Sequence, residues 1–366
     1  MINNARIIAF HLPQFHPTPE NDEWWGKGFT EWTNVAKAKP LYPGHYQPHI
    51  PADLGFYDLR LPESRHAQAE LAKEYGIEGF CYYHYWFGGG RRMLERPVDE
   101  ILASREPDFP FCLCWANHSW NNIWQGVADR TLVEQTYPGM DDHREHFEWL
   151  LKAFTDQRYI TVDGKPLFLI YSPTDIPELA EVIAYWRKLA ADAGLKGLHL
   201  VGVNYRLRPD WNPLTVGLDA STLQPLPPKN GHMPVRYFSS KIKQFLSGKK
   251  SLLTVHDYED MLDKLIRKSA PEFPDYPTVL PNWDNTPRAG ERGLVFHGST
   301  PELFRLLLHR ALSLIENQEP EKRIIFIKAW NEWAEGNYLE PDQKHGHGYL
   351  EAIRDELSAF SAGKDR

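Results

Sequence analysis

Short, wholly apolar runs alternate along the chain with longer segments in which apolar residues recur every three or four positions. Runs of the first kind are typical of parallel strands buried on both faces, and segments of the second kind are typical of amphipathic helices. The runs predict eight strands, at residues 7–12, 77–83, 111–116, 167–171, 198–203, 218–223, 278–282 and 324–330. The helical pattern predicts helices at residues 62–75, 91–104, 141–154, 176–193, 302–314 and 347–358.

This alternation predicts an α/β fold, a single (β/α)8 TIM-type barrel with long βα loops. A doubly wound open sheet is the alternative, but no Gly-x-Gly-x-x-Gly follows any predicted strand. We expect a single domain over residues 1–366, with loop insertions at about 13–61 and 225–275. Loops of this length in a compact domain are usually lids or binding loops, so we expect both insertions to cover a pocket.

Composition narrows the classes of partner. The net charge of −8 argues against nucleic acid as the main partner. The 13 Trp, 17 Tyr and 18 Phe, many of them beside His, Asn or Gln, suit carbohydrate binding, although many are equally expected in an ordinary core. No window reaches the length of a membrane-spanning helix. The first residues do not resemble a signal peptide, which predicts a cytoplasmic protein as the sequence is written, or a periplasmic or secreted one if a leader was removed.

The clearest chemistry follows the last predicted strand, in the segment Asn331-Glu332-Trp333-Ala334-Glu335-Gly336. Catalytic groups of TIM barrels lie at the C-terminal ends of strands, and glycoside hydrolysis uses paired carboxylates. In the first turn of a helix, residues three apart have Cβ atoms roughly 5–6 Å apart, close to the ~5–5.5 Å between the carboxyl groups of retaining glycosidases. We therefore predict Glu332 and Glu335 as catalytic residues. The alternative is a solvated helix start with acidic residues at the positive dipole end, for which the flanking Trp330 and Trp333 would be unusual.

Further aromatic and polar side chains are predicted near the C-terminal ends of strands or in the first insertion. Aromatic faces stack on sugars, and amide and imidazole groups bond to hydroxyls. The predicted substrate-binding residues are His11, Gln14, Trp32, Tyr83, His84, Trp86, Trp115, Asn117, His118, Trp120, Asn204, Tyr205, Trp283, Asp284, Trp330, Asn331 and Trp333. A buried core histidine is the alternative for each histidine alone, and Asp284 lies in a good turn sequence, where it could simply hold its loop. For Glu31, a pocket carboxylate and a cap contact both stay open.

No metal or cofactor site is predicted. His11, His84 and His118 fall at the ends of neighbouring strands and could bind a metal, but no nearby carboxylate completes a recognisable metal signature. Hydrogen bonds to sugar hydroxyls are the preferred interpretation. The three cysteines lie in apolar, strand-like runs and are expected to be buried free thiols.

Motifs spread nearly end to end along the chain carry a family resemblance. They are AFHLPQFH at 9–16, WWGKGFTEW at 24–32, GFCYYHYW at 79–86, CWANH at 114–118, WDNTPR at 283–288 and NEWAEG at 331–336. Together they resemble the WbsX-type proteins, often described as glycosyltransferases of polysaccharide clusters. The last motif resembles the catalytic signature of a related family, the endo-α-mannosidases of glycoside hydrolase family 99.

The mannosidase resemblance implies a role for each glutamate. In that family the first glutamate deprotonates the substrate's own 2-hydroxyl, whose oxygen attacks C1 to give an epoxide-like intermediate. The second is the general acid and then the base that activates water. The resemblance therefore implies Glu332 as the base and Glu335 as the acid/base. It also implies a sugar whose 2-hydroxyl is trans to the leaving group, as in α-mannosides and α-rhamnosides.

The expected function is a retaining glycoside hydrolase that cleaves an α-linked manno- or rhamno-configured sugar in an oligosaccharide or polysaccharide, without a cofactor. One alternative is a glycosyltransferase in surface-polysaccharide (O-antigen type) biosynthesis, favoured by the common description of the family and by the lack of a signal peptide. The absence of an Asp-x-Asp motif disfavours it. The other alternative is a non-catalytic carbohydrate-binding protein, disfavoured because both glutamates are present. The exact sugar, its linkage, exo or endo action and the oligomeric state stay open.

Overall fold

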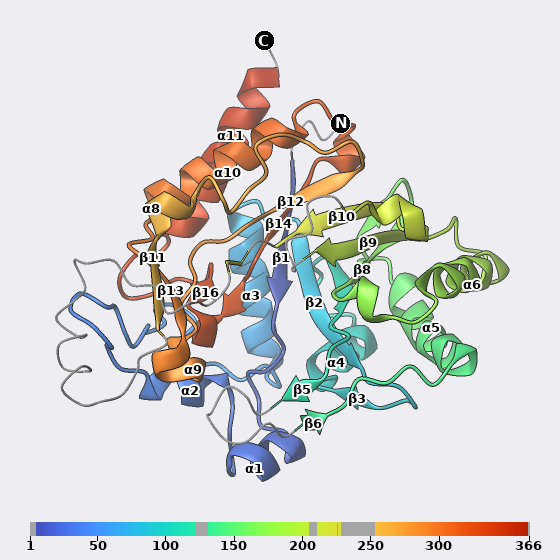
Figure 1. The fold of residues 1–366 in the computed structure, drawn as a ribbon, viewed down its shortest axis with the longest axis horizontal. Coiled ribbons are helices and arrows are strands. Elements are labelled where there is room, and N and C mark those ends of the chain that lie inside the picture. The colour runs from blue at the N-terminus through green and yellow to red at the C-terminus, as the bar shows by residue number, and fades with distance from the viewer. Residues whose placement is uncertain (1–4, 122–130, 205–210, 225, 228–252, 365–366) are drawn as a thin grey trace.

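The computed structural model of the chain describes residues 5–121, 131–204, 211–224, 226–227 and 253–364. Within these ranges, eight parallel strands surround the centre of the molecule (Figure 1). They are β1 (Arg6–His11), β2 (Gly79–Trp86), β4 (Phe111–Trp115), β8 (Lys165–Ile170), β9 (His199–Asn204), β10 (Ala220–Leu223), β12 (Asp275–Val279) and β14 (Ile324–Ile327). Each strand pairs with the next, and β14 pairs with β1, so the sheet closes on itself. The predicted (β/α)8 barrel is confirmed and the open sheet is excluded.

Helices cover the outside of the barrel between successive strands. They are α3 (Pro62–Glu74), α4 (Arg96–Ser104), α5 (Met140–Phe154), α6 (Leu179–Asp192), α10 (Pro301–Ile315) and α11 (Gly348–Lys364). Helix α10 shows how the sequence specifies them, because Thr300 caps its first turn by accepting from the Leu303 amide and Pro301 occupies the first helical position. The apolar face of α10 then buries Phe304 and Leu308 against the barrel.

Shorter elements complete the fold. The short strands are β3 (Arg92–Met93), β5 (Trp120–Asn121), β6 (Thr131–Val133), β7 (Thr161–Val162), β11 (Thr254–Asp257), β13 (Leu294–His297), β15 (Asn331–Glu332) and β16 (Asn337–Tyr338). The short α-helices are α1 (Pro19–Trp25), α2 (Glu31–Lys37), α8 (Tyr258–Met261) and α9 (Thr286–Ala289). Single 3-10 turns lie at η2 (Pro173–Asp175), η3 (Pro213–Val216), η5 (Gly290–Arg292), η6 (Pro320–Lys322) and η7 (Trp333–Glu335).

Several predicted boundaries were wrong, among them the end of the last helix, which was predicted at residue 358 and lies at Lys364. The helix predicted from residue 91 begins at Arg96, because Pro97 is tolerated only in a first turn and because Arg92–Met93 pairs with the end of β2. Strand β12 begins at Asp275, whose carboxylate accepts from Ser221 Oγ, and ends at Val279. Strand β14 ends at Ile327, although the Lys328 and Trp330 amides still donate to carbonyls of the neighbouring strands.

The first insertion lies at the C-terminal end of the barrel, where α1, α2 and α9 gather at the lower edge of Figure 1. Of the second insertion, residues 226–227 and 253–275 are described. They contribute β11, which pairs in parallel with β13 to form a small sheet beside the barrel. A separate apolar cluster of Tyr42, Leu253, Val255 and Val295 joins this small sheet to the first insertion.

The two faces of each barrel strand contact different layers. On β2, Tyr83 points into the barrel, where its ring lies 5.5 Å from that of Phe10. The next residue, His84, points outward and stacks on Trp149 of α5 with ring centroids 4.4 Å apart. This alternation follows from the two-residue period of a strand. It decides which strand residues can reach a site at the top of the barrel.

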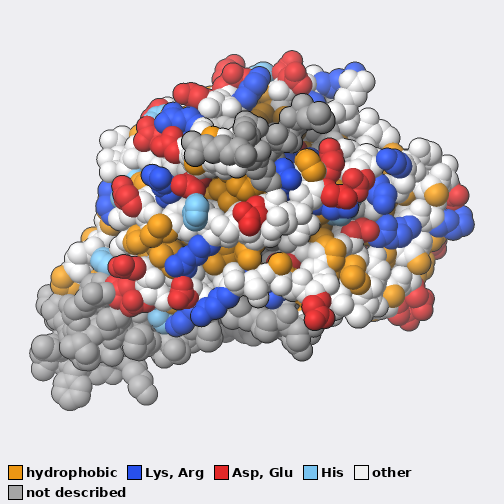
Figure 2. Space-filling model, turned by 90° about the horizontal axis from the view of Figure 1, so that it is seen from above, with side chains coloured by type: hydrophobic (Ala, Val, Ile, Leu, Met, Phe, Trp, Pro, Cys, Tyr) orange, Lys and Arg blue, Asp and Glu red, His pale blue; other side chains and the backbone are white. Residues whose placement is uncertain are grey.

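The surface on the side of α10 and α11 is mixed in charge. Figure 2 shows acidic and basic side chains interspersed over this face, with hydrophobic side chains between them. Among the described residues, each helix is too short or too polar to serve as a membrane span.

Candidate functional site

The two glutamates lie at the C-terminal end of the barrel, directly after β14. Glu332 is in β15, which pairs with β16, and Glu335 ends the 3-10 turn η7. Gly336 then reverses the chain with a φ of 59°. The predicted first turn of an α-helix is therefore a 3-10 turn between two short strands. Glu332 and Glu335 are only 5% and 7% exposed.

Asn331 fixes this segment to the end of β1. Its Oδ1 accepts from the Leu12 amide at 2.7 Å, and its Nδ2 donates to the Leu12 carbonyl at 3.0 Å. Nδ2 also lies 3.1 Å from the hydroxyl of Tyr57. The side-chain amide of Asn331 thus pairs with the Leu12 backbone as a neighbouring strand would. This pairing fixes the position of the next residue, Glu332, at the end of the barrel.

Lys328 is the buried cation of the site. Its Nζ lies 3.0 Å from Oε1 of Glu332 and 3.1 Å from the hydroxyl of Tyr83, and 5.8 Å from the centre of the Trp283 ring. Burial alone would lower the pKa of Lys328, but the charges of Glu332 and Glu335 and the hydrogen bond to Glu332 together outweigh burial and raise it. Lys328 is therefore charged and paired with Glu332.

Arg288 of α9 bridges two carboxylates. Its Nη1 donates to Oε1 of Glu335 at 2.6 Å, and its Nε and Nη2 donate to Oε2 of Glu31 at 3.0 and 2.9 Å. Glu31, which the sequence left open, is therefore an ion-pair partner that ties the first insertion to the glutamate pair. A planar guanidinium suits this bridging role better than a lysine would.

The surroundings push the pKa values of the two glutamates apart. Burial tends to raise the pKa of Glu332, but the Lys328 ammonium and a hydrogen bond shared with Glu335 lower it below its usual range. Burial and the adjacent Glu332 charge raise the pKa of Glu335. The contact with Arg288 opposes this rise but does not reverse it, because the guanidinium is shared with Glu31. The pKa values of the two carboxyl groups are thus shifted in opposite directions, as in known acid/base pairs.

Of the predicted binding residues, Tyr83, Trp283 and Asn331 contact the groups of this site, whereas Trp32, Trp330 and Trp333 pack on other aromatic rings. Tyr83 and Trp283 lie against Lys328, and Asn331 supports Glu332 from behind. Trp333 stacks on Tyr338 with ring centroids 3.7 Å apart, while Trp32 packs against Trp333 at 5.5 Å. Trp330 is fully buried against Phe80.

Other predicted residues point away from the pair, into the layer between the barrel and its helices. His84 lies 2.9 Å from His146, and Trp86 donates to Asp142 of α5. Trp115 donates to the Trp86 carbonyl at 2.9 Å. His11 lies against α3, where its Nε2 is 3.2 Å from Gln68 Oε1. His84 and His11 thus point to different neighbours and do not converge with His118 on one point. The described residues hold no cluster of three or more side chains that could bind a metal ion.

The remaining predicted residues have local contacts. Asn117 holds the backbone of Ser172, Trp120 packs on Tyr85, and Gln14 lies 3.5 Å from Asn21. His118 lies 5.4 Å from the Tyr171 ring, and Asn204 is buried at the end of β9. Tyr205 lies outside the described residues.

Asp284 holds the loop after β12. Its Oδ2 accepts from His45 and Gln47, each at 2.7 Å, and its Oδ1 accepts from the amide and hydroxyl of Thr286. Its backbone amide donates to the Glu335 carbonyl at 2.6 Å. Both carboxylate oxygens are thus engaged by the protein, which fits the loop-holding interpretation of this residue.

Sequence reasoning missed four residues of this site, and it placed a fifth, Gln224, at the end of the sixth strand on the catalytic face. Lys328 and Arg288 pair with the glutamates, and Tyr85 and Tyr171 interact electrostatically with Glu332. Gln224, after β10, is buried, and neither of its amide atoms has a hydrogen-bond partner. Two features of the sequence could have indicated Lys328 and Tyr85. A lysine inside an apolar run is seldom buried unless it is paired, and Tyr83 and Tyr85 share a strand face.

Comparison with known proteins identifies the family. Residues 7–353 match the family model described as Glycosyltransferase WbsX. The chain belongs to the WbsX family. This WbsX chain is 39% identical over 355 residues to the uncharacterized protein WxcX of Xanthomonas campestris pv. campestris, from strain B100 and equally from strain ATCC 33913. The match covers 97% of the chain and 50% of each relative, so the chain spans about half the length of these relatives.

Solved structures with the same fold include glycoside hydrolases. The WbsX chain matches the GH99 endo-α-mannosidase of Bacteroides thetaiotaomicron with a TM-score of 0.56 and 16% identity, over 99% of both chains. It matches a glycoside hydrolase-like protein with a TM-score of 0.58 and 16% identity, over 97% of this chain and 94% of the other. At this identity the matches establish a shared glycosidase-like barrel, and the activity has to be argued from the site.

Proposed function

We propose that the chain is a retaining glycoside hydrolase that cleaves an α-linked manno- or rhamno-configured sugar. The observation that carries this proposal is the placement of Glu332 and Glu335 together at the C-terminal end of the barrel, both buried, with Lys328 3.0 Å from Glu332 and Arg288 2.6 Å from Glu335. A general acid and a base held side by side are what glycoside cleavage requires. The shared fold with GH99 mannosidases supports the same reading.

In the proposed reaction Glu332 removes the proton of the substrate 2-hydroxyl. The freed oxygen attacks C1, while Glu335 donates its proton to the departing glycosidic oxygen. The C1–O bond to the leaving group breaks as the C1–O2 bond forms, giving a 1,2-anhydro sugar. Glu335 then removes a proton from water, the water oxygen attacks C1, and Glu332 returns the proton to O2. Two displacements at C1 give net retention.

The surrounding residues have supporting roles in this proposal. Lys328 keeps Glu332 ionised by direct pairing at 3.0 Å. Arg288, which is itself paired with Glu31, holds Glu335 in place through its Oε1. The rings of Tyr83 and Trp283 lie beside this cluster and offer aromatic surface to a sugar ring.

The proposal is tested by incubating the full chain with aryl α-mannosides, aryl α-rhamnosides and defined oligosaccharides, with and without nucleotide sugars. We expect release of sugar in plain buffer and no effect of nucleotide sugars. Glu332→Gln should abolish release from every substrate, because the first step loses its base. Glu335→Gln should slow poor leaving groups far more than activated aryl groups, since acid help matters less for a stable leaving group. An equal loss on both kinds of substrate would argue against an acid role.

A glycosyltransferase in surface-polysaccharide synthesis is the second candidate. The observation that favours it is the description of the matched family as a glycosyltransferase. The same incubation separates the two functions. Product formation that requires a nucleotide sugar, without hydrolysis of any α-glycoside, would establish the transferase and reject the hydrolase.

A further inference from the structure

A polar cavity lies beside the glutamate pair on the same side of the barrel. Its volume is about 140 Å³, and its wall comes from residues 44–49 of the first insertion, residues 282–299 around β13 and residues 336–349 after β14. Asp284 and Gly336 line it, and they are also packed together, since a Cβ on Gly336 would lie 2.8 Å from the Asp284 Cβ. Because Gly336 directly follows Glu335, the cavity and the glutamate pair share one wall.

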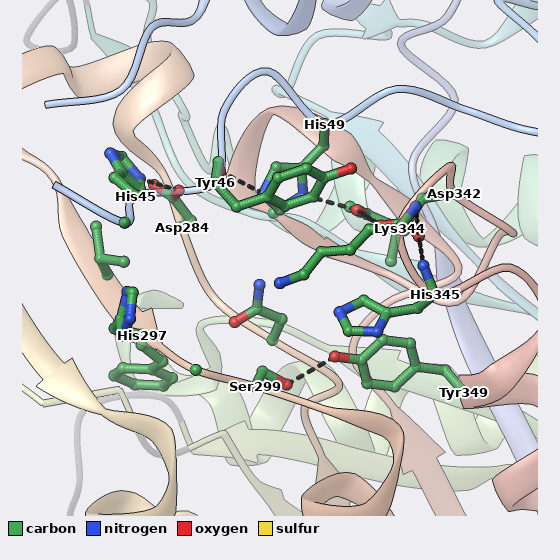
Figure 3. Close-up of a pocket in the computed structure, with 17 residues that line it drawn as sticks. His45, Tyr46, His49, Asp284, His297, Ser299, Asp342, Lys344, His345 and Tyr349 are labelled. Atoms are coloured by element: carbon green, nitrogen blue, oxygen red, sulfur yellow. Dashed lines mark hydrogen bonds and ion pairs between the residues drawn. The ribbon is translucent and has the colours of Figure 1, made fainter. Parts of the chain in front are cut away.

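Aromatic rings and polar groups mix in the cavity lining. Figure 3 shows Lys344 extending across the space between Tyr46 and Tyr349, and its Nζ lies 4.7 Å from the centre of the Tyr46 ring. Asn282 also faces the cavity, and its Oδ1 is buried without a hydrogen-bond partner. Buried acceptors are seldom left unmatched, so a ligand hydroxyl at Asn282 would satisfy one.

The charges around the cavity decide the class of ligand. Asp284 accepts from His45 and Gln47, and Asp342 accepts from the Tyr338 hydroxyl and the amides of residues 344 and 345. Their oxygens are engaged, so they do not form an open carboxylate cage for a metal ion. Their two negative charges nevertheless outnumber the single positive charge of the Lys344 ammonium, and this balance disfavours phosphate and other anions. A neutral ligand rich in hydroxyl groups fits this mixture of donors, acceptors and rings best.

We propose that this cavity binds one neutral sugar residue of the substrate, away from the bond that is cleaved. The cavity is smaller than the roughly 300 Å³ at which sites for drug-sized ligands begin, which suits a single sugar ring. This inference rests on the proposed function and makes its substrate an oligosaccharide or polysaccharide. Binding of a remote sugar would also position the reacting sugar against Glu332 and Glu335.

The test measures binding apart from turnover. The full chain carrying Glu335→Gln is titrated calorimetrically with α-linked manno- and rhamno-tetrasaccharides and with the corresponding methyl monoglycosides. Asn282→Ala and Lys344→Ala are added to this background, with Gln343→Ala as the control, an exposed neighbour in the same loop that does not line the cavity. We expect each cavity variant to weaken tetrasaccharide binding about tenfold or more. The control should stay within about twofold of the background, in the range of a neutral contact.

Equal tetrasaccharide binding in the cavity variants and in Gln343→Ala would overturn the inference, as would a background that binds no tetrasaccharide of the panel. These outcomes are distinct from failure of the proposed function. Binding that depends on Asn282 and Lys344, together with a wild-type chain that hydrolyses nothing, would support the cavity and reject the hydrolase. If instead the otherwise wild-type chain hydrolyses the tetrasaccharides equally well with and without Asn282→Ala or Lys344→Ala, the hydrolase is supported and the cavity is rejected as a sugar site.

Discussion

Removal of the Lys328 ammonium tests the charge arrangement on which the proposed chemistry depends. Lys328→Met keeps an unbranched apolar side chain and deletes the charge that lies 3.0 Å from Glu332, in a pair whose side chains are 5% and 6% exposed. Breaking a buried pair by removing one partner costs about 3–5 kcal/mol, because the remaining charge is left uncompensated. An exposed pair contributes about 0–1 kcal/mol.

This loss translates into a measurable shift in melting temperature. The entropy of unfolding is about 2.1 cal/mol/K per residue, or about 0.8 kcal/mol/K for 366 residues. A loss of about 3–5 kcal/mol therefore lowers Tm by about 4–7 °C at neutral pH. Lys322→Met is the matched control, since Lys322 and its partner Glu319 lie 2.9 Å apart but are 36% and 72% exposed. Its Tm should change by about 1 °C or less.

The destabilisation caused by Lys328→Met should also depend on pH in a defined direction. In the wild-type chain the pKa of Glu332 is lowered, so its pairing stabilises the fold above the ordinary pKa of a glutamate and this stabilisation is lost as pH falls. Without Lys328 the pKa of Glu332 rises, and the carboxylate takes up a proton more easily in the folded state. The destabilisation of Lys328→Met should thus be largest at neutral pH and should shrink as the pH is lowered toward about 4.

Calorimetry at several pH values and a double-mutant cycle decide the matter. Glu332→Gln added to Lys328→Met should restore part of the lost stability, because two neutral buried groups replace one unpaired charge. The reasoning is refuted if Lys328→Met is no more destabilising than Lys322→Met, or if the two losses at Lys328 and Glu332 simply add.

Three smaller perturbations test other contacts of the site. Burial and the Glu332 charge raise the pKa of Glu335 to about 8, so kcat/KM should fall as pH rises through about 8. The pH profile of kcat/KM for Glu335→Gln on an activated aryl glycoside should lack this limb. Asp284→Ala leaves the buried donors of His45 and Thr286 unmatched, and urea denaturation should show a loss of about 2–4 kcal/mol; a loss below about 1 kcal/mol contradicts its loop-holding role. Gly336→Ala places a Cβ 2.8 Å from the Asp284 Cβ at a φ of 59°, so it should lower the free energy of unfolding by about 1–3 kcal/mol and reduce activity. The control Gly363→Ala has open space around its Cβ and should change neither quantity.

The barrel was predictable because each of its strands is a distinct apolar run. Residues 324–327 and 111–115 are buried throughout in the structure, as expected for strands covered on both sides. Because these strands are apolar along their whole length, the sequence does not indicate which side chains point into the barrel. A strand that is apolar on both faces has no polar alternation, so His84 and Tyr83 looked equally suited to the site, yet only Tyr83 points into the barrel.

The glutamate pair was predictable from its position after the last strand, but its partners were not. Arg288 and Glu31 lie 257 residues apart in the chain and meet only because the first insertion folds over the loop that follows β12. Such a contact leaves no local pattern in the sequence. Lys328 did leave one, a lysine within an otherwise apolar strand, which predicts a buried partner even when the partner itself is unknown.

The most direct test of the proposed function is the anomer first released from an aryl α-mannoside or α-rhamnoside by the full chain, observed by proton NMR in the first minutes of reaction without any nucleotide sugar. The Glu332–Glu335 pair predicts the α-anomer as the first product, and no product from Glu332→Gln. The β-anomer as the first product would contradict retention, and no sugar release from any α-glycoside would contradict the hydrolase itself.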